Sequence, residues 1–303
     1  MFKSFSAYFN GRWMPSDECM VSINDRGFTL GDGVFEIERT FNGKIFDLDG
    51  HLERLFRSLK HVRIDPGLTQ REMVQISEEA IHRNWSLVPS GGDMQVTQRI
   101  TRGIGRSAAQ AGPSTVYIGG GPLDFGRFAN LYDIGCHVVF AKTRAHHPSS
   151  LDPKVKHQSR MNFVLADLEA NDVDPNSWPA ILDLDGNIAE GIGFNIWIVT
   201  DGILKSPDDK TMLQGISRKN IIELARQLDI PVVTENIQLY DVYNADEVFI
   251  SVTSPCILPV SKIDSRPLEG NYPGPIASRL LSAWSEKIGI DIIGQCKAQV
   301  GLK

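Results

Sequence analysis

The chain has 303 residues, 42% of them hydrophobic and 22% charged, which is enough for one large domain or two ordinary ones with real cores. Its net charge of −6 and its scattered basic residues exclude nucleic acid and anionic membranes as favoured partners and point to a small-molecule ligand. No apolar run approaches the roughly eighteen residues of a membrane span, and the four cysteines lie far apart. We therefore expect a cytoplasmic protein without disulfides or a metal site.

Strand and helix patterns alternate over the first 120 residues. Hydrophobic runs bounded by turn residues predict strands at 8–14, 19–23, 34–41, 44–48, 94–101 and 114–119. Asn42-Gly43 favours a type I′ hairpin between two of them. Asp49 is expected to cap a helix with Leu52, Leu55, Phe56, Leu59 and Val62 on one face, and a second helix covers about 71–84. These patterns predict a small α+β domain.

A glycine-rich stretch then interrupts the pattern. It begins at Gly119-Gly-Gly-Pro, and strand signals resume at about residue 135. We place the domain boundary here, with a small domain over residues 1–120, a linker over 121–133 and a larger α/β domain over 134–303.

Lys156 lies just ahead of a helix pattern. Met161, Val164, Leu165 and Leu168 recur at helical spacing, so they share one face, which we expect to be buried. A lysine that enters a buried helix loses part of its hydration, which lowers its pKa from about 10.4 and produces an amine nucleophile. A solvated lysine, or one that caps a neighbour, would have the same local sequence.

Two further segments of the second half could contact a ligand. Glu190 precedes Gly191-Ile-Gly193 in a strand pattern, where glycine lets another group approach the backbone. Ser217 is expected to cap a helix that follows Gly215, and the free N–H groups of such a helix end can bind phosphate. An ordinary exposed glutamate and an ordinary capped helix are the alternatives.

Arg54 is unusual for its position. It lies in the first turn of the helix that Asp49 would cap, where a cation opposes the helix dipole. A function could explain this small cost, and a solvated arginine beside Glu53 is the alternative.

Together these segments resemble the class IV aminotransferases, the pyridoxal-phosphate enzymes of fold type IV. The resemblance covers nearly the whole chain and rests on ordered motifs. These are Asp25-Arg-Gly-Phe-Thr-Leu-Gly-Asp-Gly-Val-Phe-Glu36, His51-Leu-Glu-Arg54-Leu, Lys156 with Glu169-Ala170 downstream, Glu190-Gly-Ile-Gly-Phe-Asn195 and Leu213-Gln-Gly-Ile-Ser-Arg218.

The resemblance implies roles for individual residues. Lys156 would bind the cofactor covalently and shuttle a proton, and Glu190 would keep the pyridine nitrogen protonated. Leu213 would press on the ring face. The phosphate would be held by Arg54, by the N–H groups of Ile216 and Ser217, and by the Thr253-Ser254 turn.

The sequence departs from the family next to the lysine. Branched-chain enzymes place a tyrosine near the fifth position after it, and here Arg160 and Met161 occupy that stretch. We therefore assign no residue to the phenolic oxygen of the cofactor.

The substrate pocket is predicted from one strand and its surroundings. Thr97 and Arg99 share a strand face, and Arg99 falls where branched-chain enzymes recognise a carboxylate. Arg106 is the alternative carboxylate ligand, by analogy with D-amino acid enzymes. Leu30 and Phe35 would form an apolar wall.

We therefore expect a homodimeric transaminase that moves an amino group between a 2-oxo acid and a hydrophobic amino acid, branched-chain-like or D-, or a primary (R)-amine. A pyridoxal-phosphate lyase of the aminodeoxychorismate type is the alternative, and a catalytically silent binding protein is a third reading.

Overall fold

The computed structural model describes residues 4–270 and 272–302, and these residues form two compact units. Unit 1 contains Met1–Asp124 together with Val155–Arg160, and unit 2 contains Phe125–Lys154 and Met161–Lys303. The first division falls within the linker expected over residues 121–133. The short segment around Lys156 belongs to unit 1, so the chain passes between the units more than once, whereas the prediction had a single linker.

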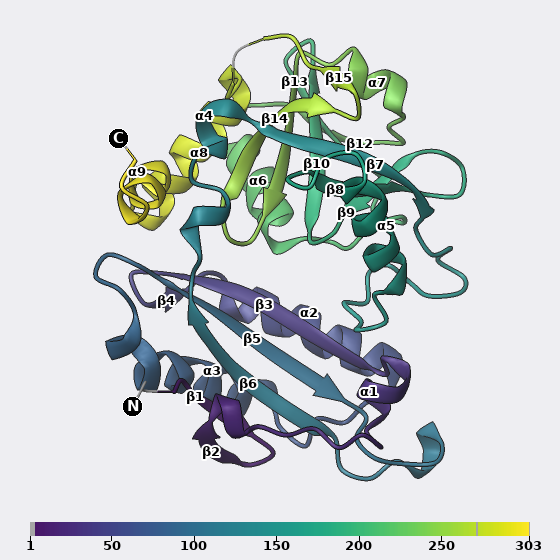
Figure 1. Cartoon of the computed structure of the whole chain (residues 1–303). Helices are drawn as coiled ribbons and strands as arrows, with labels where there is room; N and C mark the ends of the chain where they lie inside the picture. Colours follow the sequence, from purple (N-terminus) through teal and green to yellow (C-terminus); the bar gives the residue numbers. More distant parts are fainter. Residues whose placement is uncertain (1–3, 271, 303) are drawn as a thin grey trace. The chain divides into compact units, whose positions relative to one another are not determined.

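Unit 1 is a six-stranded antiparallel sheet in the order β2-β1-β6-β5-β3-β4, with α2 and α3 packed against it (Figure 1). The strands are β1 Ser6–Phe9, β2 Arg12–Pro15, β3 Gly33–Phe41, β4 Lys44–Ile45, β5 Met94–Thr101 and β6 Thr115–Pro122. The helices are α1 Arg26–Leu30, α2 Leu48–Val62 and α3 Gln70–Asn84, with short 3₁₀ turns at Ser16–Glu18, Trp85–Leu87 and Ala108–Gln110.

Three of the predicted strands and part of the predicted linker differ from the structure. The strand predicted at 44–48 is only β4 Lys44–Ile45, because Leu48 already begins α2. The stretch 8–14 is a hairpin that turns at Asn10-Gly11, where both residues have positive φ, and 19–23 is not a strand. The sequence contained a signal for the hairpin at 8–14, because Asn10-Gly11 is a dipeptide typical of a type I′ hairpin turn. The glycine run assigned to a linker extends β6 to Pro122 instead. The hairpin between β3 and β4 is confirmed, because Asn42 and Gly43 have φ of 50° and 76°, both in the left-handed region.

The N-cap of α2 is Asp47, whose side chain accepts a hydrogen bond from the Gly50 N–H, so the prediction of Asp49 was wrong. Both aspartates are eligible caps by sequence, and Asp49 falls instead in the first turn, where it favours the helix dipole.

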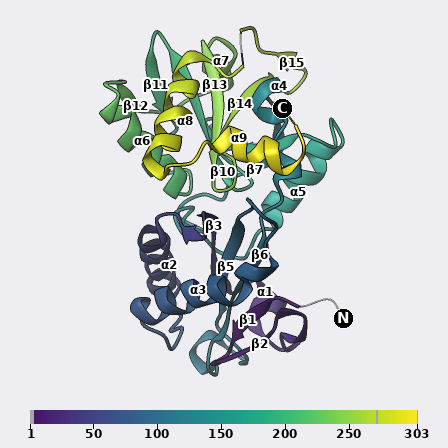
Figure 2. The same ribbon diagram turned by 90° about the vertical axis from the view of Figure 1, so that its left-hand side faces the viewer.

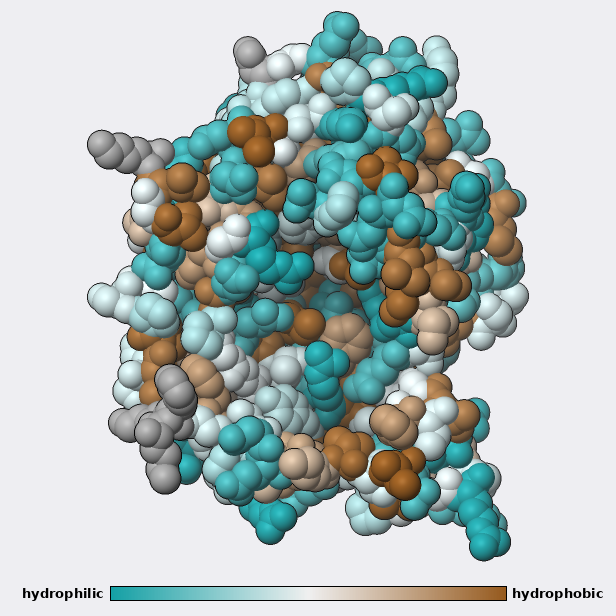
Figure 3. Space-filling model, in the orientation of Figure 1, coloured by the Kyte–Doolittle hydropathy of each residue, from teal (hydrophilic) through white to brown (hydrophobic). Residues whose placement is uncertain are grey.

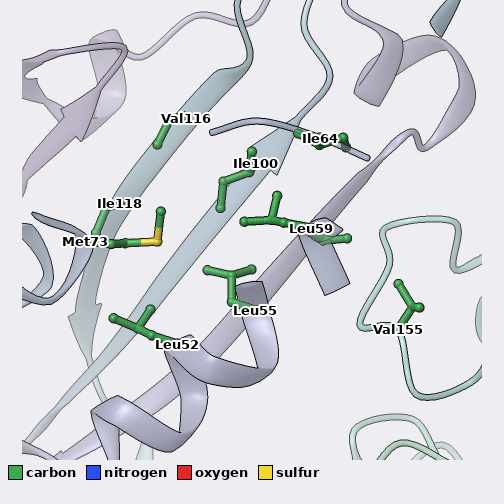
Figure 4. Close-up of a cluster of buried hydrophobic side chains, with 10 residues drawn as sticks. Leu52, Leu55, Leu59, Ile64, Met73, Ile100, Val116, Ile118 and Val155 are labelled. Atoms are coloured by element: carbon green, nitrogen blue, oxygen red, sulfur yellow. The ribbon is translucent and has the colours of Figure 1, made fainter. Parts of the chain in front are cut away.

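The predicted apolar face of α2 is confirmed. Its leucines point at the sheet and form the core of unit 1, where burial of each side chain contributes about 1.5–3 kcal/mol (Figure 4). The buried members of this cluster are Val34, Leu52, Leu55, Leu59, Ile64, Met73, Ile100, Val116, Ile118 and Val155.

Unit 2 is built on a nine-stranded mixed sheet in the order β12-β11-β10-β13-β14-β7-β8-β9, with β15 paired to β14. The strands are β7 Cys136–Arg144, β8 Trp178–Leu182, β9 Ile188–Gly191, β10 Phe194–Thr200, β11 Ile203–Ser206, β12 Val232–Thr234, β13 Glu247–Val252, β14 Cys256–Ile263 and β15 Arg266–Pro267.

Different helices of unit 2 pack on different strands of its sheet. Helices α6 and α8 pack together on β13, away from α5, which packs on β7 and β8 (Figure 2). The helices are α4 Leu131–Ile134, α5 Met161–Asn171, α6 Ile216–Gln227, α7 Leu239–Tyr243, α8 Pro275–Ile288 and α9 Ile292–Gln299, with a 3₁₀ turn at Phe125–Arg127. Among the described residues, no helix combines the length and apolarity that crossing a bilayer requires.

The face of helix α5 that was predicted to be buried is exposed. Met161, Val164, Leu165 and Leu168 are 47–69% exposed, and the buried residues are Asn162, Phe163, Ala166 and Ala170. Small side chains let the helix approach the sheet, where Phe163 and Ala166 meet Ala141, Ile181 and Ala189. Hydrophobic surface is visible in the region of α5 in Figure 3. The periodicity identified an apolar face correctly but not what it contacts.

Candidate active site

The backbone around Lys156 is paired to strand β3 of unit 1. Phe35 N–H donates to Lys156 C=O at 3.0 Å, and Gln158 N–H donates to Gly33 C=O at 2.9 Å. Lys156 N–H donates to Ser58 Oγ on α2 at 3.3 Å. The lysine is therefore fixed as an added strand segment, and not by the buried helix face that the sequence predicted.

Cations gather around the ring of Phe35, which is only 8% exposed. Lys156 Nζ lies 4.8 Å from the ring centroid, and the guanidinium carbons of Arg99 and Arg160 lie 5.5 and 5.9 Å from it. Each contact is a favourable cation–π interaction, but the positive charges repel one another. This arrangement suits an anionic ligand.

The predicted carboxylate ligands differ in their surroundings. On β5, Thr97 and Arg99 are more exposed than their neighbours, which confirms their common face, and Thr97 Oγ1 donates to the Glu36 C=O at 2.7 Å. Arg106 is exposed in the loop before β6. Among the described residues, neither Arg99 nor Arg106 forms an ion pair, so both guanidinium groups can meet a substrate. Leu30, at the end of α1, is 61% exposed.

Arg54 is buried and held by an acid from β3. Its Nε and Nη2 donate to the two carboxylate oxygens of Glu36, each at 2.7 Å, and His51 Nδ1 lies 2.9 Å from Glu36 Oε2. Because the N-cap is Asp47, Arg54 lies in the second turn of α2 and does not oppose the helix dipole. The reason for an arginine here is Glu36, and neither a solvated guanidinium nor the dipole explains it.

The ionisation of this trio follows from its contacts. Burial raises the pKa of Glu36, but the charge and hydrogen bonds of Arg54 and the hydrogen bond from His51 outweigh burial and hold that pKa well below its usual range. Burial lowers the pKa of His51 and the charges of Arg54 and Lys156 lower it further, which outweighs the hydrogen bond and the charge of Glu36 that raise it. Glu36 is thus an anion paired with Arg54, and His51 is neutral.

The loop before β3 is clamped to its surroundings. Asp32 accepts hydrogen bonds from Arg26 Nε at 2.8 Å and from Arg102 Nε and Nη2 at 2.8 and 3.0 Å. Gly31 ends α1 with a φ of 66°, and a side chain there would press on Ser159, whose Oγ donates to Gly31 C=O at 3.0 Å. The Gly31-Asp32-Gly33 sequence therefore fixes the loop beside the lysine segment.

Glu190 lies on β9 of unit 2 and is 8% exposed, so it is not an ordinary surface glutamate. Its Oε2 accepts a hydrogen bond from the Leu213 N–H at 3.3 Å. A Cβ at Gly191 would overlap the ring of Phe194. The group that approaches the backbone at this glycine is therefore Phe194.

Helix α6 opens with Gly215 as its N-cap, without a capping side chain. Ser217 is therefore a buried residue of the first turn, and the prediction that it caps the helix was wrong. Asn195 Nδ2 donates to the Leu213 C=O at 3.0 Å, and a Cβ at Gly215 would overlap Asn195 Oδ1. Glycine is required because the asparagine packs against the turn, and the N–H groups of Ile216 and Ser217 lie in the uncapped first turn.

The Thr253-Ser254 turn connects β13 to β14. Strand β13 pairs with β10 in a register that sets Val252 opposite Phe194 and Ser251 opposite Asn195. The turn therefore lies at the end of β10 where Asn195 meets the start of α6.

Sequence reasoning assigned no role to Glu36, His51 or Asn195. Glu36 had a usable signal, because Glu36 and Glu38 are acids two residues apart inside a hydrophobic strand pattern, which indicates buried carboxylates in need of partners. His51 then becomes a candidate partner, three residues before Arg54 on the same helix. Asn195 ends the glycine motif but had no local reason to be selected.

The chain is similar to known proteins over most of its length. The sequence model for class IV amino-transferases matches residues 33–263. The chain belongs to the class IV aminotransferases. A putative branched-chain-amino-acid aminotransferase of Methanocaldococcus jannaschii is 34% identical over 277 residues, covering 90% of this chain and 93% of that protein. A D-alanine aminotransferase of Bacillus licheniformis is 27% identical and covers 92% and 96%.

Solved structures show the same fold. A branched-chain aminotransferase from the thermophilic archaeon Thermoproteus uzoniensis, solved with norvaline, is 27% identical, with a TM-score of 0.83 and 97% of this chain and 96% of that chain covered. Another solved branched-chain amino acid aminotransferase contains pyridoxamine 5′-phosphate. The chain is therefore an aminotransferase of fold type IV that uses pyridoxal phosphate.

The residues of the chain fit the groups of that cofactor. A lysine amine matches an aldehyde, and the buried carboxylate of Glu190 matches a pyridine nitrogen. The buried Arg54 and the uncapped start of α6 match a phosphate.

Proposed function

We propose that this aminotransferase moves an amino group between a 2-oxo acid and a hydrophobic amino acid, either branched-chain or D-, with primary (R)-amines as further donors. The observation that carries the proposal is Lys156, fixed by β3 with its amine beside Phe35, the ring that Arg99 also contacts. The names of the relatives support both amino acid classes.

Each part of the cofactor is proposed to bind to different residues. Lys156 would attach to it covalently and Glu190 would face its ring nitrogen, while Leu213, whose N–H already bonds Glu190, would contact the ring. The phosphate would meet Arg54, the N–H groups of Ile216 and Ser217, and the side chains of Thr253 and Ser254. Bound pyridoxal phosphate supplies an electron sink for the bond to the substrate α-carbon.

The chain's own groups would handle protons and charge. The free amine of Lys156 would take a proton from the substrate α-carbon and pass that proton on to the bound cofactor. Glu190, as an anion, would hold a proton on the ring nitrogen, and its burial strengthens that interaction. The phosphate contacts would fix the reacting groups in place and lower the entropic cost of the step.

Substrate recognition is proposed to centre on Phe35. Arg99 would bind the α-carboxylate, because a planar guanidinium matches a carboxylate, and Arg106 is the second candidate. Phe35 and Leu30 would contact the hydrophobic substituent. Thr97 would border the pocket without giving up its hydroxyl hydrogen bond to the Glu36 carbonyl.

We also propose a homodimer, supported by the exposed apolar face of α5, since an apolar patch of this kind on a protein surface indicates an interface. The four free cysteines are consistent with work in the reducing cytoplasm.

The test is a panel of L-amino acids, D-amino acids and (R)- and (S)-amines, each with pyruvate or 2-oxoglutarate as acceptor. We expect turnover with hydrophobic donors only when a 2-oxo acid is present. Pyruvate release from aminodeoxychorismate without an acceptor would instead identify a lyase, and no turnover by the cofactor-loaded enzyme would contradict the proposal.

A further inference from the structure

Glu38 is a fully buried acid on β3 that the proposed reaction does not use. It lies two residues from Glu36, so both side chains leave the same face of the strand. One oxygen of each carboxylate and one ring nitrogen of His51 lie within 4.8 Å of one another. Whereas Glu36 is paired with Arg54, neither oxygen of Glu38 has a hydrogen-bond partner within the described part of the chain. An ionised carboxylate in that position would be very unfavourable.

Gln98 on β5 has a buried acceptor that lacks a donor within the described ranges. It lies opposite Glu36 in the antiparallel register, and Glu38 lies opposite Val96, so Gln98 is the diagonal neighbour of Glu38 on the same face. Gln98 Nε2 donates to Ser77 Oγ at 3.0 Å, and Ser77 Oγ donates to the Met73 C=O at 2.8 Å. Gln98 Oε1 is buried and has no donor among the described residues.

We propose that Glu38 is a protonated, uncharged carboxylic acid that donates a hydrogen bond to Gln98 Oε1 and so acts as a positioning residue for the Glu36–Arg54 pair. One proton supplies the donor that Gln98 Oε1 lacks. It also completes a chain from Glu38 through Gln98 and Ser77 to the backbone of α3.

The charges that face Glu38 agree with a neutral acid. Burial raises its pKa well above the usual range and the negative charge of Glu36 raises it further. Together they outweigh the nearby Gln98 N–H and the charges of Arg54 and Lys156, which would favour an ionised carboxylate. His51 offers no compensating charge, because burial lowers its pKa. With Glu38 neutral, Arg54 is balanced by one carboxylate only. A second anion here would reduce the attraction of Arg54 for a phosphate.

This role for Glu38 rests on the proposed contact of Arg54 with the cofactor phosphate, so the experiment separates the two. The probes are pyridoxamine 5′-phosphate and pyridoxamine, which differ only in the phosphate, titrated into the full-length apoprotein at neutral pH. Glu38→Gln keeps a neutral donor, Glu38→Leu removes it, and Glu53→Gln removes one exposed charge from α2 as the matched control.

We expect Glu38→Gln and Glu53→Gln to bind pyridoxamine 5′-phosphate within about two-fold of wild type, and Glu38→Leu to bind it about ten-fold more weakly with little change for pyridoxamine. A change of about ten-fold or more in Glu38→Gln would mean that the native residue is charged and would overturn the proposal. Equal affinity of Glu38→Leu and wild type would remove its positioning role.

The protonation state is read independently of the phosphate. The infrared difference spectrum between wild type and Glu38→Gln should contain the carbonyl band of a protonated carboxyl group, and a carboxylate band in its place would refute the neutral acid. If Arg54→Gln binds both probes like wild type while the carboxyl band is present, the proposed phosphate contact of Arg54 has failed and the neutral state of Glu38 stands.

Discussion

Arg54 donates to both carboxylate oxygens of Glu36, from Nε and from Nη2, over 2.7 Å in each case. The two residues come from α2 and β3, and both are buried. A buried ion pair adds little stability compared with apolar packing, but removing one partner leaves an uncompensated charge and costs about 3–5 kcal/mol. The pair therefore places a guanidinium inside unit 1 at a fixed orientation.

The first prediction concerns the stability of unit 1 towards acid. The pKa of Glu36 is lowered in the folded protein, so its stabilising contribution is present above the pKa of the unfolded chain and is lost as the pH falls towards the folded value. His51 acts in the same direction, because its lowered pKa means that the unfolded chain takes up the proton first. The protection factors of amides in β3 and α2, each measured against an unstructured chain at the same pH, should therefore decrease below about pH 7 through His51 and below about pH 5 through Glu36.

In Glu36→Gln the amide exchange of β3 and α2 should already be faster at neutral pH, since Arg54 loses its counter-charge. The loss of protection that Glu36 causes as the pH falls should be absent in this variant. Unchanged exchange in this variant would show that the pair does not hold unit 1 together.

The second prediction is that Lys156→Ala abolishes transamination and leaves the fold intact. The lysine is held by backbone hydrogen bonds to β3 that alanine preserves, while the amine is lost. Lys154→Ala is the control, because Lys154 forms an exposed ion pair with Asp152 and should be dispensable. Borohydride reduction of the loaded enzyme followed by peptide mapping should locate the pyridoxyl group on Lys156, and any other position would refute the assignment.

A third prediction is that Glu190→Gln retains the cofactor but transaminates slowly. The amide oxygen can still accept the hydrogen bond from the Leu213 N–H, but a neutral group no longer stabilises a protonated ring nitrogen. Rates of the separate half-reactions should fall more than cofactor affinity. Wild-type half-reaction rates would exclude Glu190 as the partner of the ring nitrogen.

The fourth prediction separates the two carboxylate candidates. Arg99→Ala should weaken binding of amino and keto acids by about ten- to a hundred-fold, equivalent to about 1.5–3 kcal/mol for a charge-assisted contact. Single-turnover reactions with an amino acid and with a matched amine should differ, because the amine has no carboxylate to lose. Equal losses for both donors, or a selective loss in Arg106→Ala only, would transfer the role to Arg106.

The fifth prediction tests the start of α6. Gly215→Ala should reduce the affinity for pyridoxamine 5′-phosphate about ten-fold or more, because the added methyl group displaces Asn195 from the turn. Gly121→Ala introduces the same group where no atom lies within 4 Å and serves as the control. Wild-type affinity in Gly215→Ala would mean that this turn does not form the phosphate site.

Local patterns predicted much of the fold. The hairpin at Asn42-Gly43, the apolar face of α2 and the extent of β5 follow from spacing and turn chemistry. The apolar face of α5 was also found, but its surroundings were not, because Ala166 and Ala170 form a second apolar face whose small residues fit closer to the sheet. Periodicity shows that a face is apolar and not which neighbour covers it.

The remaining errors come from contacts between distant parts of the sequence. Nothing near Lys156 indicates that β3 will pair with it, and nothing near Arg54 identifies Glu36, eighteen residues earlier, as its partner. The choice between Asp47 and Asp49 as the cap of α2 also depends on how the chain leaves β4. Such pairings are decided by the folded sheet, and the local signal at Glu36 indicates only that a buried acid needs a partner.

The return of Val155–Arg160 to unit 1 has a consequence for how the protein is made. When β6 has left the ribosome, the sheet of unit 1 still lacks the segment that bonds β3, and the first strand of unit 2 must be synthesised before that segment follows. The nascent chain therefore cannot finish its first unit before beginning its second. A fragment that stops at the end of β6 would carry Arg54 and Glu36 but not the lysine, so the two units cannot be produced as separate working halves by cutting the gene once.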